Sequence, residues 1–145
     1  MRGLAIRLGI IGVIALGAFI VRPFMTGSAG DLNVGDCFDE PTRGETVKDV
    51  QHHPCSDLHT GEVVFIGSLT ASTYPTSDEL QQWLVTNCVP AYQLYTGIDI
   101  RTATDSHDMS YFWPTSDGFT KGDRKVICYA VQRDGSQTKG SVRKG

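Results

Sequence analysis

The chain has 145 residues and a formal net charge of −3, with 40 % hydrophobic and 20 % charged residues. This length suits a single domain. The mildly acidic balance excludes nucleic acid as a partner, because phosphate backbones are bound by clustered Lys and Arg. Outside the N-terminal segment, basic residues cluster only in the tail sequence KGSVRKG.

Residues 4–21 read LAIRLGIIGVIALGAFIV and are apolar apart from Arg7. As a helix rising about 1.5 Å per residue, this segment would span roughly 27 Å, close to the hydrocarbon thickness of a bilayer. A cleaved secretory signal is the alternative. Its only small-residue site, Gly27-Ser28-Ala29, lies far beyond the apolar core and follows Pro23. We therefore expect residues 1–25 to form a cytoplasmic stub and a single transmembrane anchor.

The positive charges around this segment predict its orientation. Arg2 and Arg7 lie toward its N-terminal end, and only Arg22 follows it. Because cytoplasmic flanks carry the excess of Lys and Arg, the C-terminal part should be extracytoplasmic. Whether the segment is an anchor or a cleaved signal, we expect the rest of the chain to be exported. This exported part carries 10 basic and 16 acidic residues.

The exported part begins with a short polar stretch. Residues 26–31, TGSAGD, predict a flexible tether, and the domain proper should cover residues 32–142. From Asp134 onward the tail is rich in Gly, Ser and Lys and has little to bury, although it could pair along a sheet edge.

All four cysteines lie in the exported part: Cys37, Cys55, Cys88 and Cys128. An even number of cysteines in an oxidising compartment predicts disulfides. No pair has the C-x-x-C spacing of a redox centre or a zinc ribbon. The sequence alone allows three pairings.

Several segments of the exported part have strand character. GEVVFIGSLT is the strongest, because it is β-branched and aromatic. ETVKDVQ alternates through Val47 and predicts an edge strand. In chain order the extended segments are residues 32–38 with a turn at Gly35-Asp36, then 45–51, 61–70, 109–115 and 124–132, the last two joined by a loop with Gly118 and Gly122.

One helix separates these strands. Thr76 followed by Glu79 is a capping box, and Gly97 is a stop signal. Pro90 predicts a kink or a restart. The positions expected on one buried face are Leu80, Trp83, Leu84, Asn87 and Cys88.

Strands, one helix and more strands predict a small α+β domain with an antiparallel sheet and the helix packed on one face. Cys88 would then face inward above Cys128 in the sheet, which favours this pair and leaves Cys37 to bond Cys55. Trp113, like Trp83 in the helix, is expected in the core.

The segment HHPCSDLHTGEVVF offers three interpretations. A zinc site needs ligands that converge on one point, but adjacent extended histidines point apart. A Cys55 nucleophile with His59 as its base needs a free thiol, which an oxidising compartment disfavours. We favour the third interpretation: Cys55 forms a disulfide, His59 is partly buried and bonds a turn, and Glu62 is on the polar side of a strand. No cofactor or metal is expected.

The motifs together resemble the septum formation family of envelope proteins of high-GC Gram-positive bacteria. The resemblance covers roughly residues 31–142 and is carried by VGDCF, PCSDLHTGEVV, a helix cysteine, FTKGDRKVICY and a closing GS. Phe119 stands where the family commonly has Trp. The matching positions are Gly35, Asp36, Cys37, Cys55, His59, Glu62, Val63, Cys88, Pro114, Gly122, Asp123, Arg124 and Cys128.

The resemblance implies a membrane-associated, extracytoplasmic role at division septa. We expect a non-catalytic protein that contacts division or cell-wall proteins, or else an accessory or ligand-sensing subunit of a larger membrane complex. His59 and Arg124 could form a small polar ledge for a ligand, with Asp36, Glu62 and Asp123 as further candidates. The alternative is that these side chains satisfy the backbone of turns.

Overall fold

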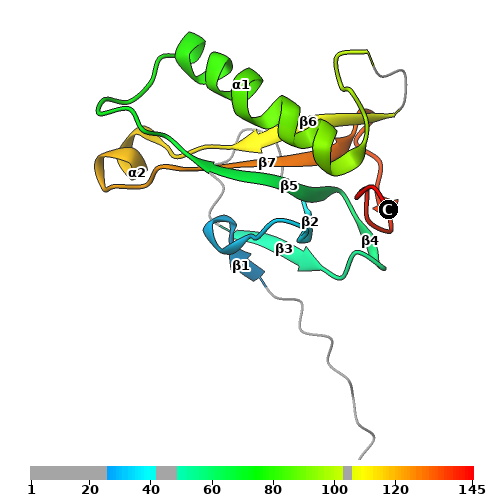
Figure 1. Cartoon of the computed structure of the whole chain (residues 1–145). Coiled ribbons are helices and arrows are strands. Elements are labelled where there is room, and N and C mark those ends of the chain that lie inside the picture. The colour runs from blue at the N-terminus through cyan, green and yellow to red at the C-terminus, as the bar shows by residue number, and fades with distance from the viewer. Residues whose placement is uncertain (1–25, 42–48, 103–105) are drawn as a thin grey trace, which may run out of the picture.

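The computed structural model describes residues 26–41, 49–102 and 106–145, which form an α+β domain with one main helix across an antiparallel sheet (Figure 1). The six-stranded sheet has the order β1-β3-β2-β5-β7-β6, and β4 pairs with β8 in a separate ribbon. The elements are β1 (Thr26–Ser28), η1 (Ala29–Asp31), β2 (Cys37–Asp39), β3 (Asp49–His53), β4 (Leu58–His59), β5 (Gly61–Ser68), α1 (Ser77–Thr96), β6 (His107–Phe112), α2 (Ser116–Thr120), β7 (Lys125–Gln132) and β8 (Thr138–Lys139). The predicted fold class is confirmed for the described residues.

The predicted membrane anchor lies outside the described residues. Among residues 26–41, 49–102 and 106–145, no helix combines the length and the apolar character that crossing a membrane requires.

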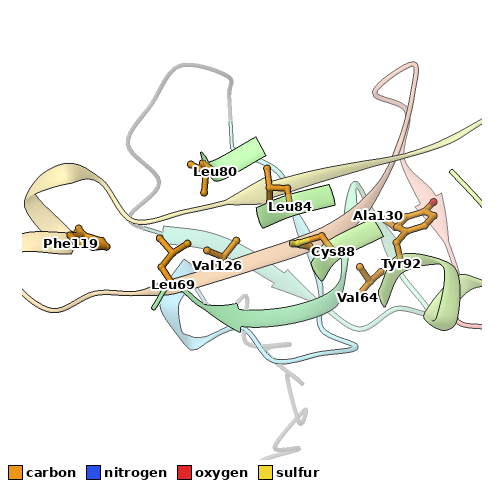
Figure 2. Packing of buried hydrophobic residues seen from close by; sticks show 10 residues of the cluster. Val64, Leu69, Leu80, Leu84, Cys88, Tyr92, Phe119, Val126 and Ala130 are labelled. Atoms are coloured by element: carbon orange, nitrogen blue, oxygen red, sulfur yellow. A yellow bond between two sulfur atoms is a disulfide. The ribbon is translucent and has the colours of Figure 1, made fainter. Parts of the chain in front are cut away.

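The two longest strands of the sheet, β5 and β7, have 8 residues each and pair antiparallel, and β5 is the strand that the sequence predicts to be strongest. β7 is buried on both faces because its side chains alternate between two core clusters. Val126, Cys128 and Ala130 belong to the cluster on the α1 side, where Figure 2 shows Val126 and Ala130, whereas Ile127 and Tyr129 face the opposite side.

Helix α1 begins and ends where its sequence predicts. Thr76 and Glu79 form the reciprocal capping box, and Gly97 closes the helix with φ of 77°. Pro90 does not interrupt α1. Pro90 and Thr86 are both exposed, so the Thr86 carbonyl that loses its N–H partner can be hydrated.

Both predicted disulfides are present. Cys88–Cys128 joins α1 to β7 with a Cα–Cα distance of 6.0 Å, and Cys37–Cys55 joins β2 to the turn before β4 at 5.2 Å. One disulfide therefore fixes the helix on the sheet, and the other fixes β2 beside the turn that leads into β4.

Three expectations about the strands and loops are wrong. Residues 26–31 are not a tether, because β1 pairs with β3 and Ala29 belongs to the second core cluster. The edge strand expected at residues 45–51 is described only from residue 49, and there it belongs to β3, which is not at the edge because it lies between β1 and β2. The glycine-containing loop before β7 holds a short helix, α2, whose Phe119 is buried.

Candidate functional site

Glu62, one of the polar residues that the sequence singled out, is buried. It lies on β5 opposite Cys37 of β2 and Ala130 of β7, and its exposed fraction is 1 %. The expectation that Glu62 is on the polar side of a strand is therefore wrong. It shares its face with Val64, beneath the C-terminal end of α1, where the chain's tail covers it.

The Glu62 carboxylate accepts three hydrogen bonds. The Tyr95 hydroxyl donates to Oε1 at 2.7 Å, the Ser141 hydroxyl donates to Oε1 at 2.6 Å, and the Val142 N–H donates to Oε2 at 2.7 Å. Hydrogen bonds to an ionised group are stronger than neutral ones and offset the cost of burying the charge. Glu62 therefore holds α1 and the tail onto β5.

Tyr95 is suited to donate to this carboxylate. Its partial burial raises its pKa to about 12, and the hydrogen bond to Glu62 raises the pKa in the same direction. At neutral pH the phenol therefore keeps its proton. The Arg143 guanidinium lies 5.4 Å from the centre of the Tyr95 ring and covers it from the tail side.

The tail is fixed at further points around this cluster. Gly140 N–H donates to the Cys55 carbonyl at 2.6 Å, and Lys144 N–H donates to the Tyr95 carbonyl at 2.8 Å. β8 of the tail pairs with β4. The sequence allows the tail to pair along a strand edge, as β8 does with β4. It does not indicate that the tail also covers the Glu62 carboxylate.

The Cys37–Cys55 disulfide lies directly beside Glu62. The two sulfur atoms and a carboxylate oxygen are all within 4.8 Å of one another. This trio does not fit a metal ion, because both sulfurs are bonded to each other and neither is a thiolate. The short distances instead show that the Cys37–Cys55 disulfide and the Glu62 carboxylate are closely packed.

His59 is completely buried, with an exposed fraction of 0 %. Its Nδ1 lies 2.9 Å from the Asp57 carbonyl, so the ring donates its proton to the turn before β4. No hydrogen-bond partner of Nε2 is found among the described residues. The predicted contact of His59 with a turn is confirmed. The side chain is more deeply buried than expected, so the imidazole does not reach the solvent where a substrate would bind.

The other motif residues also bond to turns. Asp36 accepts from Asn33 N–H at 2.8 Å, and Asp123 accepts from Lys125 N–H at 3.0 Å. Arg124 stacks on the Phe119 ring at 3.4 Å and donates to the Phe119 and Asp123 carbonyls at 2.5 and 3.0 Å.

The expected ledge of His59 and Arg124 does not form. His59 precedes Gly61, which pairs with Val131, whereas Arg124 precedes Lys125, which pairs with Ser68. The separation of seven positions from Gly61 to Ser68 corresponds to roughly 23 Å along a strand. Figure 1 accordingly shows α2 and the C-terminus at opposite ends of the sheet.

A second feature was missed at the α2 end of the domain, where aromatic side chains are exposed. Tyr74 and Tyr111 are each 40 % exposed and Trp113 is 38 % exposed, so the core position expected for Trp113 is wrong. The Tyr111 and Trp113 rings lie 4.9 Å apart, and the Tyr74 hydroxyl donates to the Pro114 carbonyl at 3.2 Å. We call Tyr74, Tyr111 and Trp113 the aromatic band.

The family comparison covers both features. A family model described as septum formation matches residues 34–144, a range that contains both disulfides, Glu62 and the aromatic band. Comparisons with curated proteins and with solved structures gave no match. Because the match extends over most of the sequence, the chain belongs to the septum formation family.

Proposed function

We propose that this protein is a membrane-anchored, non-catalytic component of the division septum whose exported domain contacts cell-division or cell-wall proteins. Membership of the septum formation family indicates a role in the dividing envelope, and the two disulfides fit an exported domain. The contact role and the absence of catalysis are our inference.

One observation carries the proposal: the polar motif residues point inward or into turns, while large aromatic residues point outward. Both oxygens of Glu62 are occupied by donors from the chain itself. Tyr74, Tyr111 and Trp113 are exposed instead. Exposed Tyr and Trp are enriched in protein interfaces, whereas an active site needs polar groups that reach the substrate.

An anchor at residues 4–21 would keep the domain close to the bilayer. β1 begins at Thr26, five residues after Val21, so an extended connection spans at most about 18 Å. The partner would therefore be a membrane protein or a wall component near the membrane surface.

Arg124 gives little support to the alternative of a ligand sensor. Its guanidinium is stacked on Phe119 and donates to two carbonyls of the same turn. A ligand at this position would have to displace those contacts.

Affinity purification tests the proposal. The full chain, tagged at its C-terminus, is recovered from gently solubilised membranes of dividing cells, and its partners are identified by mass spectrometry. We expect an envelope or division protein to be recovered in stoichiometric amount, with both proteins at the septum by fluorescence. Recovery of no membrane or wall protein, or uniform distribution around the cell, would refute the contact role.

A further inference from the structure

We propose that the aromatic band binds an extended, proline-containing, basic segment of the partner. The inference rests on the proposed contact function and adds to it the surface and the chemistry of the ligand.

The aromatic band is built from three parts of the chain. Tyr111 comes from β6, Trp113 from the segment that follows it, and Tyr74 from the loop before α1. The Phe119 ring of α2 contacts the Tyr74 ring, with centres 5.5 Å apart in an edge-to-face arrangement, and the Tyr111 and Trp113 rings contact each other at 4.9 Å. These contacts order the rings, which lowers the entropy that a ligand must offset on binding.

The edge of the sheet adds backbone groups to this surface. β6 pairs with β7 alone among the described strands. Ser106 carbonyl accepts from Arg133 N–H, and alternate β6 residues from there bond to β7. Tyr111 falls in the other set, so its backbone N–H and carbonyl point away from β7, where an extended peptide could bond them.

Four acidic residues, which we call the acidic rim, lie close in the sequence to Tyr74 and to Phe119. Asp78 and Glu79 follow Tyr74 at the start of α1, and Asp117 and Asp123 flank Phe119; all four are exposed. Hydrogen bonds from Thr76 lower the pKa of Glu79, which keeps it ionised.

Basic residues next to Phe119 offset most of this acidic rim. Lys121, Arg124 and Lys125 keep their positive charges, because hydrogen bonds to carbonyl oxygens do not neutralise them. Four acidic residues against three basic ones leave one net negative charge, which favours a positively charged ligand.

Proline is the residue type that best suits the exposed rings of the aromatic band. Proline-rich segments adopt the polyproline II helix before binding, with about three residues per turn, and their rings pack against Tyr and Trp side chains. A neutral or acidic glycan could also stack on the rings, but it would gain nothing from the acidic rim. In a basic, proline-containing segment the proline rings would pack on the band and the basic side chains would meet the acidic rim. Only its non-proline residues can donate an N–H to the β6 edge, because proline has none.

The test uses the full 145-residue chain in detergent micelles, labelled with ¹⁵N and with both disulfides intact. Three synthetic peptides are titrated: Pro-Pro-Arg repeats, Ala-Ala-Arg repeats of equal charge, and Pro-Pro-Glu repeats of opposite charge. The chain has two tryptophans, so the indole N–H of Trp113 reports binding and that of Trp83, packed against Phe65, is an internal control.

We expect the Trp113 signal to move with Pro-Pro-Arg repeats, which should bind at least about tenfold more tightly than either other peptide. Trp113→Ser and Tyr111→Ser should each weaken binding by about tenfold or more, as removal of a central aromatic anchor does. Leu94→Ser removes an 84 % exposed apolar side chain from α1 and should leave binding unchanged.

Equal affinity for the three peptides, movement of Trp83 instead of Trp113, or unchanged binding by both aromatic variants would overturn the inference. Saturable binding of soluble chitin oligosaccharides in place of the peptides would also overturn it. A failure of this inference can be told apart from a failure of the proposed contact function. If the tagged Trp113→Ser chain still recovers the envelope partner that the unsubstituted chain recovers, this surface is wrong but the contact role stands.

Discussion

Replacing Glu62 with glutamine isolates the contribution of one buried charge. Glutamine keeps the shape of glutamate but replaces one oxygen with an NH₂ group. With the remaining oxygen placed to accept from Tyr95 and Ser141, the NH₂ faces the Val142 N–H, and two donors meet.

The cost can be worked from these contacts. Leaving one buried donor unpaired costs about 1–3 kcal/mol, and the two remaining bonds each weaken by roughly 0.5–1 kcal/mol when the acceptor loses its charge. Relief from burying a charge offsets part of this sum. We therefore expect Glu62→Gln to lower the free energy of unfolding by about 2–3 kcal/mol.

Denaturant unfolding with both disulfides intact measures this difference. The control is Asp31→Asn, the same kind of change at an exposed carboxylate, which should stay within about 0.5 kcal/mol of the unsubstituted protein. Hydrogen exchange supplies a local readout, because the Val142 amide should lose its protection in Glu62→Gln. A loss below about 0.5 kcal/mol together with a still protected Val142 amide would refute the role given to Glu62.

Three further predictions concern the remaining framework. Folding raises the pKa of Tyr95 from 10.0 to about 12, so between these pH values the folded state keeps a proton that the unfolded state has lost. The free energy of unfolding should therefore fall as the pH rises from about 10 to 12. Tyr95→Phe should make this fall less steep when unfolding is measured across that pH range. Replacing Cys88 and Cys128 with alanine should cost roughly 4 kcal/mol for the 40-residue separation, and an unchanged unfolding midpoint would contradict it. Leu84→Ala should cost about 2–5 kcal/mol whereas Leu94→Ala should be nearly neutral by thermal unfolding, and equal effects would contradict the facing of α1.

The elements with local signals could be predicted from the sequence. The capping box, the 3.6-residue period and Gly97 define α1, and they place Cys88 on the buried face where it meets Cys128. The apolar run of β5 likewise identifies a central strand. Pro90 shows the limit of a local rule, because its cost depends on whether the freed carbonyl faces water or protein.

The environment of Glu62 could not be predicted in the same way. Its partners Tyr95 and Ser141 are 33 and 79 residues away in the sequence. A single charged residue in a strand predicts a solvent-facing position, and only the path of the tail reverses that expectation. A serine, a tyrosine and a backbone N–H carry no periodic signal that would mark them as its donors.

The exposed aromatic residues illustrate the opposite error. Trp113 was placed in the core because large aromatic residues are usually buried. It follows β6, the last described strand on its side of the sheet, where no neighbouring strand covers it. Position at the edge of a sheet depends on strand order, which the sequence does not encode locally.

Photo-crosslinking in dividing cells measures the contact role most directly. A photoreactive phenylalanine analogue replaces Tyr111 in one full-length chain and Leu94 in another, and the crosslinked products are identified by mass spectrometry. We predict one dominant envelope protein at position 111, captured through a basic, proline-containing segment, and none at position 94. Absence of any crosslink at position 111, or the same products at both positions, would contradict a role in contact through this surface.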